Sequence, residues 1–140
     1  EIKPPPSRGF EVGQVVARQA ARLWCGAPVP PLLSSFDAEA LRAAHQEAPE
    51  LPRARVFERL RRGWLQQCLD LDCVAVVAEY PQWNPDTVAR ARAAGLRVLS
   101  YTVNRASVAH RLVTLGTQGI IGDCWLAPRV HPGATPQGNS

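Results

Sequence analysis

The chain has 140 residues, of which 46% are hydrophobic and 20% charged, a composition typical of one ordinary globular domain. No apolar run approaches the roughly 20 residues of a membrane-spanning helix and no signal peptide is evident, so we expect a cytoplasmic protein without a membrane span. The formal charge of +4 comes from arginines scattered over expected helix surfaces rather than gathered in a basic stripe, which argues against a nucleic-acid partner.

Short apolar segments alternate with segments of helical period along the chain. The expected strands are one that includes Ile2, then residues 31–36, 54–57, 73–78, 96–104 and 118–123. The expected helices are residues 11–24, whose apolar side chains are Val12, Val15, Val16, Ala20 and Leu23; a helix capped by Asp37 that carries Leu41, Ala44 and Ala48; one around Trp64–Leu69; one from Pro85 to Gly95; and one capped by Ser107 that ends at Gly116. We expect residues 1–126 to form the domain and residues 127–140 a loose tail.

Alternating strands and helices predict a parallel sheet covered by helices, either a barrel or an open sheet. No glycine-rich phosphate-binding motif stands at a strand-to-helix turn, so a nucleotide-binding open sheet loses support. Polar residues instead follow the strands, as they do at the catalytic rim of a TIM barrel. These residues are Glu1, Lys3, Ser34, Ser35, Thr102, Asn104 and Asp123.

Glu1 and Lys3 are two positions apart on an expected strand, so both side chains leave the same face. A carboxylate in a barrel lumen needs a cation, which is either a metal ion or the neighbouring ammonium group. Spacing alone leaves both open, including a simple ion pair at the end of the chain.

The four cysteines, Cys25, Cys68, Cys73 and Cys124, form no CxxC pair, which indicates neither a zinc site nor a redox motif. We expect buried free thiols.

Four segments carry a resemblance to a known family: EIKP, PLLSSFDAEALRAAHQEAPELPR, GLRVLSYTVN and GIIGD. In this order, from Glu1 to about Asp123, the chain resembles the glycerophosphodiester phosphodiesterases of the cytoplasmic bacterial type. The resemblance implies a TIM (β/α)8 barrel, of which this chain supplies about the last six units. The family's earlier His-Arg-Gly, Glu-x-Asp and His-Asp segments do not occur here, so we expect them upstream in a longer enzyme.

The resemblance also implies a function, which is metal-dependent hydrolysis of a small-molecule glycerophosphodiester to sn-glycerol 3-phosphate and an alcohol. Glu1 matches a ligand of Mg²⁺ or Ca²⁺, and Lys3 matches a catalytic cation at the phosphate. Phe36, Tyr101 and Asn104 match substrate-pocket positions. If the strand runs straight to Asn104, Tyr101 faces the opposite side, so one of the two must lie past the strand end.

The family's two acid-base histidines have no counterpart here, since His45, His110 and His131 fall on expected surfaces, and we expect this fragment alone to be inactive. Tyr101 replaces the family's usual tryptophan and Gly122 its usual threonine, which removes a hydroxyl. Glu79, Tyr80 and Trp83 are expected to reshape one wall of the pocket. The sequence leaves open which alcohol is released. It also leaves open whether the enzyme acts on lysophospholipids, whether the barrel is catalytically dead and used for binding, and whether the protein forms a homodimer.

Overall fold

The computed structural model describes residues 1–123 of the chain as a five-stranded parallel sheet whose strands lie side by side in chain order. Residues 124–140, which include the predicted tail, Cys124 and His131, lie outside the described residues. Parallel neighbours need a long crossover between them, and a helix supplies it in each case. The strands are β1 (Leu33–Ser35), β2 (Arg53–Phe57), β3 (Ala75–Glu79), β4 (Arg97–Tyr101) and β5 (Gly119–Ile120).

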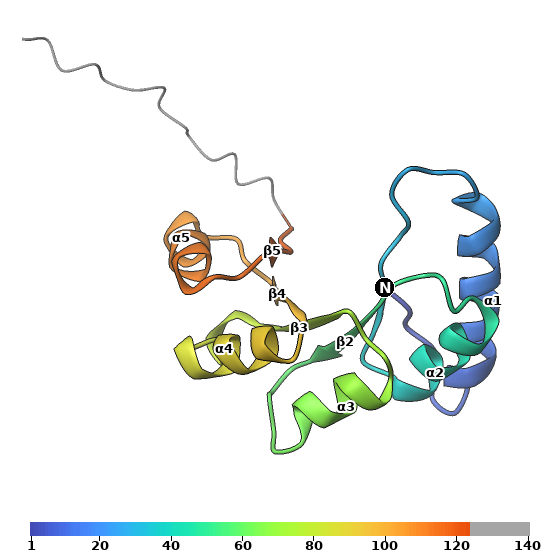
Figure 1. The fold of residues 1–140 in the computed structure, drawn as a ribbon, viewed down its shortest axis with the longest axis horizontal. Coiled ribbons are helices and arrows are strands. Elements are labelled where there is room, and N and C mark those ends of the chain that lie inside the picture. The colour runs from blue at the N-terminus through green and yellow to red at the C-terminus, as the bar shows by residue number, and fades with distance from the viewer. Residues whose placement is uncertain (124–140) are drawn as a thin grey trace, which may run out of the picture.

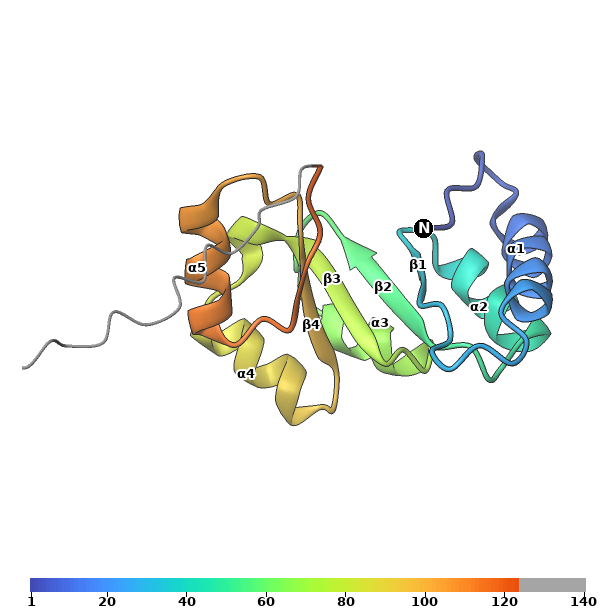
Figure 2. The same ribbon diagram turned by 90° about the horizontal axis from the view of Figure 1, so that it is seen from above.

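The helices form an arc along one side of this sheet, and the other side is left concave (Figure 1). The helices are α1 (Gly9–Leu23), α2 (Ala38–Glu47), α3 (Trp64–Asp70), α4 (Pro85–Ala93) and α5 (Ala106–Leu115), with a short 3₁₀ helix at Tyr80–Gln82. Seen from above, β1 to β4 follow one another, with α1 and α2 beyond β1 and α5 beyond β4 (Figure 2). Among residues 1–123, no helix has the length and apolar character to cross a membrane.

The start of the chain, where a strand including Ile2 was expected, is not a regular strand in the structure, but it lies beside the sheet. The backbone N–H of Ile2 donates a hydrogen bond to the carbonyl oxygen of Ser34, 2.7 Å away, so the segment Glu1–Lys3 lies beside β1. Ile2 itself is buried against α1 and α2, and the neighbouring Glu1 and Lys3 are exposed. The alternation of faces predicted for this segment is therefore present.

The sheet separates two sets of buried side chains. Val76 and Val98 point toward α3, α4 and α5 and form the larger core with Leu41, Trp64, Cys68, Trp83 and Leu112. On the concave side, Ala54, Val56, Ala75 and Val77 pack with Leu99 and Tyr101. Strands buried on both faces read as continuous apolar runs, which explains why residues 73–78 were recognisable as a strand.

Helices α1 and α2 approach each other very closely. A Cβ atom added at Gly13 would lie 2.3 Å from the carbonyl oxygen of Ala40, so the contact requires glycine. The buried residues of α1 are accordingly small, namely Gly9, Gly13, Ala17 and Ala20. The prediction of a helix here is confirmed, but Val15 and Leu23, which were expected on its buried face, are 49% and 68% exposed.

Helix starts were predicted with mixed success. The Asp37 carboxylate accepts a hydrogen bond from the Ala40 N–H at 3.0 Å, which confirms it as the N-cap of α2. The prediction for Ser107 is wrong, because α5 begins at Ala106 after Arg105, with no side chain capping it. The strand expected to reach residue 104 ends at Tyr101, since the chain leaves β4 there to form the loop to α5.

The view that all arginines lie on helix surfaces is also wrong. Arg53 lies on β2 and is only 3% exposed. Its guanidinium donates to the carbonyl oxygens of Leu51 (2.7 Å) and Asp72 (3.1 Å), and the Asp72 carboxylate lies 3.5 Å away. These acceptors compensate the cost of burying the charge.

Two of the cysteines are buried free thiols, as predicted. Burial raises the pKa of Cys68 to about 12 and that of Cys73 to about 11. Cys25 is also a free thiol, but it is exposed, because it lies in the turn that follows α1.

Candidate active site

The polar side chains predicted to meet at one rim follow the carboxyl ends of parallel strands, so the fold brings them to the same edge. Glu1 and Lys3 stand beside the end of β1, and the Lys3 ammonium lies 3.4 Å from the Glu1 carboxylate. The Lys3 side chain is 76% exposed and that of Glu1 is 34% exposed. The ion pair that the sequence left open is thus formed, and water screens it well enough that it adds little to stability.

A cavity of about 380 Å³ opens next to this pair. Lys3 and Phe36 line it, together with Ile2, Pro4, Ser35 and Asp37. The Ser35 hydroxyl donates to the Ile2 carbonyl oxygen at 2.7 Å and accepts from the Asp37 N–H at 3.0 Å, which ties three of the lining residues together. One cation and one aromatic ring therefore face a space large enough for a small phosphorylated molecule.

Tyr101 reaches the same rim from β4. Its ring packs edge-on against Phe36, with the ring centroids 5.9 Å apart, and its hydroxyl donates to the carbonyl oxygen of Phe57 at 3.0 Å. The pKa of Tyr101 is raised to about 12, first by burial and then by the nearby carboxylates of Glu79, Glu58 and Glu1. Phe36 thus forms an aromatic wall of the cavity, and Tyr101, which is not among the residues that line this cavity, packs against the Phe36 ring.

Asn104 lies past the end of β4, as the parity argument required for one of the two residues. Its amide Nδ2 donates to the Asp123 carboxylate and its Oδ1 accepts from the Asp123 N–H, both at 2.9 Å. This pair of hydrogen bonds ties the loop after β4 to the end of β5. The amide is thereby held in place, and its polar atoms are used within the protein.

Gly122 does more than remove a hydroxyl from this rim. A Cβ atom at this position would lie 2.4 Å from the carbonyl oxygen of Val103 and 3.1 Å from Oδ1 of Asn104. The backbone therefore packs too closely here for a threonine, unless the loop shifts.

The expected remodelling of the pocket by Glu79, Tyr80 and Trp83 is only partly present. Trp83 is 1% exposed and packs in the core under the helices, where its indole N–H donates to the carbonyl oxygen of Leu99 at 3.1 Å. Tyr80 packs against the same core. Glu79, at the end of β3, is the one of the three that acts on the rim, through its charge beside Tyr101.

The part of the chain that the structure describes contains no group of three or more His, Cys, Asp or Glu side chains positioned to hold a metal ion. Glu1 offers one carboxylate at this rim, the kind of ligand that a hard divalent cation prefers. Of the histidines among residues 1–123, His110 is exposed on α5, and Nδ1 of His45 on α2 lies 3.9 Å from the Asp72 carboxylate, so neither lies at the strand ends.

Sequence reasoning missed several charged residues at the end of β2. Glu58 follows this strand, and Arg55, Arg59 and Arg61 line a second cavity beside it. The signal was visible in the segment RARVFERLRR, where polar residues follow a strand, but it was interpreted as a solvated surface.

Solved structures resemble this fold along most of the chain. A phosphodiesterase from Oleispira antarctica, solved in complex with the product sn-glycerol-3-phosphate, is 26% identical, with a TM-score of 0.78 over 86% of this chain and 49% of its own. A putative glycerophosphoryl diester phosphodiesterase from Silicibacter pomeroyi is 23% identical, with a TM-score of 0.73 over 86% of this chain and 44% of its own. A glycerophosphodiester phosphodiesterase from Parabacteroides distasonis is 16% identical, with a TM-score of 0.71 over 86% and 50%.

The chain thus spans about half the length of these solved structures, and its sheet and helices correspond to part of their TIM barrel. No curated protein sequence matches it. The model of the glycerophosphoryl diester phosphodiesterase family matches residues 3–125, which is most of the sequence. The chain therefore belongs to the glycerophosphoryl diester phosphodiesterase family.

Proposed function

We propose that the protein containing this chain hydrolyses glycerophosphodiesters to sn-glycerol 3-phosphate and an alcohol. The observation that carries the proposal is the position of Lys3, which brings an exposed cation to a cavity at the strand ends in a chain that belongs to this family. The phosphodiester is an anion, and an ammonium group beside it offsets the charge that grows on its oxygens during hydrolysis.

The other rim residues suit complementary tasks. Phe36 and Tyr101 pack edge to face and offer an apolar wall to the carbon atoms of the glycerol. Asn104 holds the loop at the edge of this pocket through Asp123. Fixed positions matter, since misplacing the substrate by about 1 Å can cost roughly a hundredfold in rate.

Glu1 is proposed as one ligand of a divalent cation, either Mg²⁺ or Ca²⁺, whose further ligands come from outside residues 1–123. A hard cation of this kind prefers carboxylate oxygens, and Glu1 presents one at the rim. When bound, it would polarise the phosphoryl oxygens.

Hydrolysis also needs a group that gives a proton to the leaving alcohol, and we propose no residue of this chain for that step. His45 and His110 sit on helices, away from the strand ends. We therefore expect the 140 residues alone to be inactive. By its resemblance to the cytoplasmic bacterial type, we place the full-length protein in the cytoplasm, with water-soluble diesters as substrates.

The test is an assay of the full-length protein with glycerophosphocholine, in which sn-glycerol 3-phosphate is detected by a coupled dehydrogenase. We expect release of this product, loss of activity with a chelator, and recovery when Mg²⁺ or Ca²⁺ is added back. Turnover of lysophosphatidylcholine in preference to glycerophosphocholine would favour the lysophospholipid alternative. No turnover of either, with the fold intact by circular dichroism, would contradict the proposal and favour a binding role.

A further inference from the structure

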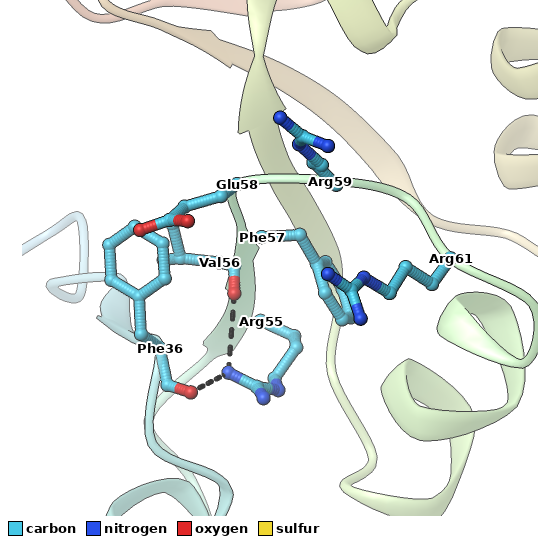
Figure 3. A pocket seen from close by; sticks show the side chains of 7 residues that line it. All are labelled: Phe36, Arg55, Val56, Phe57, Glu58, Arg59 and Arg61. Atoms are coloured by element: carbon cyan, nitrogen blue, oxygen red, sulfur yellow. Dashed lines mark hydrogen bonds between the residues drawn. The ribbon is translucent and has the colours of Figure 1, made fainter.

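A second cavity, of about 560 Å³, lies at the carboxyl end of β2 (Figure 3). We call it the basic pocket, and its charged lining consists of Arg55, Arg59, Arg61 and Glu58. Phe36 lines both this pocket and the smaller cavity of Lys3, so the two spaces adjoin at this residue. A molecule bound at Lys3 therefore has the basic pocket beside it.

The lining carries a formal charge of +2, from three guanidinium groups less one carboxylate. Arg55 is already engaged within the protein, because it donates to the carbonyl oxygens of Ser35 (3.2 Å), Val56 (3.2 Å) and Phe36. Arg59 and Arg61 are exposed, and within residues 1–123 neither side chain has a hydrogen bond or an ion pair. Two guanidinium groups are thus available to a ligand.

The charged groups that line the pocket favour an anionic ligand that also carries hydroxyl groups. Guanidinium groups bind phosphate, as they bind carboxylate, through paired N–H donors. A phosphate monoester carries more negative charge than a carboxylate near neutral pH, which suits a lining with a formal charge of +2. Glu58 is the one acceptor among the charged groups, and a carboxylate at that place suits hydroxyl donors. In Figure 3, Phe36 and Glu58 lie on one side of Arg55, and Phe57 and Arg61 on the other, with the Arg55 guanidinium 4.9 Å from the centre of the Phe57 ring.

We propose that the basic pocket binds the alcohol half of the diester when that alcohol is a polyol bearing its own phosphate group. Arg59 and Arg61 hold the phosphate monoester, and Glu58 accepts hydrogen bonds from the polyol hydroxyls. The diester phosphate sits at Lys3, on the other side of the Phe36 ring. This inference rests on the proposed function, and it names a substrate class for the same site.

The experiment compares two diesters that differ by one phosphate, glycerophosphoinositol and glycerophosphoinositol 4-phosphate, in the full-length protein. We expect a lower KM for the second. The double variant Arg59→Ala/Arg61→Ala should raise the KM for glycerophosphoinositol 4-phosphate about tenfold and leave that for glycerophosphoinositol unchanged. The matched control is Arg62→Ala, an exposed arginine of the same segment that does not line the pocket, which should change neither constant.

Each outcome decides the proposal. An equal change of KM for both diesters, no change for either, or the same loss in Arg62→Ala would overturn it. Measuring the binding of both diesters by calorimetry separates this proposal from the proposed function. If the protein does not hydrolyse them, tighter binding of glycerophosphoinositol 4-phosphate that is lost in Arg59→Ala/Arg61→Ala would still support the basic pocket. Equally tight, arginine-dependent binding of inorganic phosphate would assign the pocket to a free anion and overturn the substrate assignment.

Discussion

The hydroxyl of Tyr101 on β4 donates a hydrogen bond to the carbonyl oxygen of Phe57 at the end of β2, and so joins two strands that have β3 between them. The phenol stays neutral in this position, because burial and three carboxylates oppose its ionisation. Tyr101 thus links the aromatic wall of the first cavity to the strand that carries the basic pocket.

The Tyr101 hydroxyl should therefore lose its proton only at a higher pH than an ordinary tyrosine. Its pKa is raised from 10 to about 12, so its stabilising effect on the fold is complete below about pH 10 and is lost as the pH rises toward about 12. The measurement is the phenolate absorbance of the full-length protein minus that of Tyr101→Phe, as a function of pH. A difference signal that rises at about pH 10 would contradict the environment described for this residue.

Replacing Lys3 by alanine should raise KM and lower kcat together, since the ammonium is proposed to contact the phosphate both before and during hydrolysis. We expect a loss of about a hundredfold in kcat/KM for glycerophosphocholine. Arg8→Ala is a suitable control, because Arg8 is an exposed cation that pairs with Glu11 at the start of α1. Unchanged constants would return Lys3 to the role of an ion-pair partner of Glu1.

Replacing Glu1 by glutamine removes a charge and almost no volume. In the full-length protein it should abolish the activity that depends on the divalent cation, while the thermal unfolding curve stays unchanged. Titration of the variant with Mg²⁺ or Ca²⁺ is the informative measurement, and full turnover at the concentration of cation that saturates the wild type would refute the ligand assignment.

Gly13→Ala should destabilise the protein, although alanine is the better helix former. The added methyl group would collide with the carbonyl oxygen of Ala40, and overpacking of this kind costs about 1 to 3 kcal/mol. Gln19→Ala, on the exposed side of the same helix, serves as the control and should change the free energy of unfolding little. Equal stability of the two variants in urea unfolding would show that α1 and α2 can separate slightly without cost.

The cysteines should differ in reactivity. At about pH 8, Cys25 should react with a thiol reagent in the native protein, and Cys68 and Cys73 should react only after unfolding, since burial protects them and raises their pKa values to about 12 and 11. Peptide mass spectrometry after brief alkylation distinguishes the three. Early labelling of Cys68 would mean that α3 opens readily.

The sequence allowed the alternation of strands and helices to be predicted because each element depends on nearby residues. Asp37 caps α2 through a hydrogen bond to a residue three positions away, and such a signal is local. Arg53 could not be predicted as buried, since its acceptors at Leu51 and Asp72 are brought together only by the folded chain. Likewise, Arg59 and Arg61 line a pocket only because the folded chain brings Phe36, which follows β1, next to the end of β2.

The face of α1 illustrates a different limit. Hydrophobicity favoured Val15 and Leu23 as buried residues, whereas the distance between two helices selected Gly13 and Ala17. Pattern analysis assigns burial by polarity, but close helix contacts are decided by side-chain volume.

The contact between Gly122 and the carbonyl oxygen of Val103 also bears on how this protein can change over generations. A hydroxyl can return to position 122 only together with a second change that moves the loop at residues 103 and 104, so the two sites are epistatic. A single mutation at position 122 therefore cannot add the hydroxyl without disturbing the loop. Under selection for a different substrate, we expect changes first at the exposed arginines of the basic pocket, which can be replaced without such a clash.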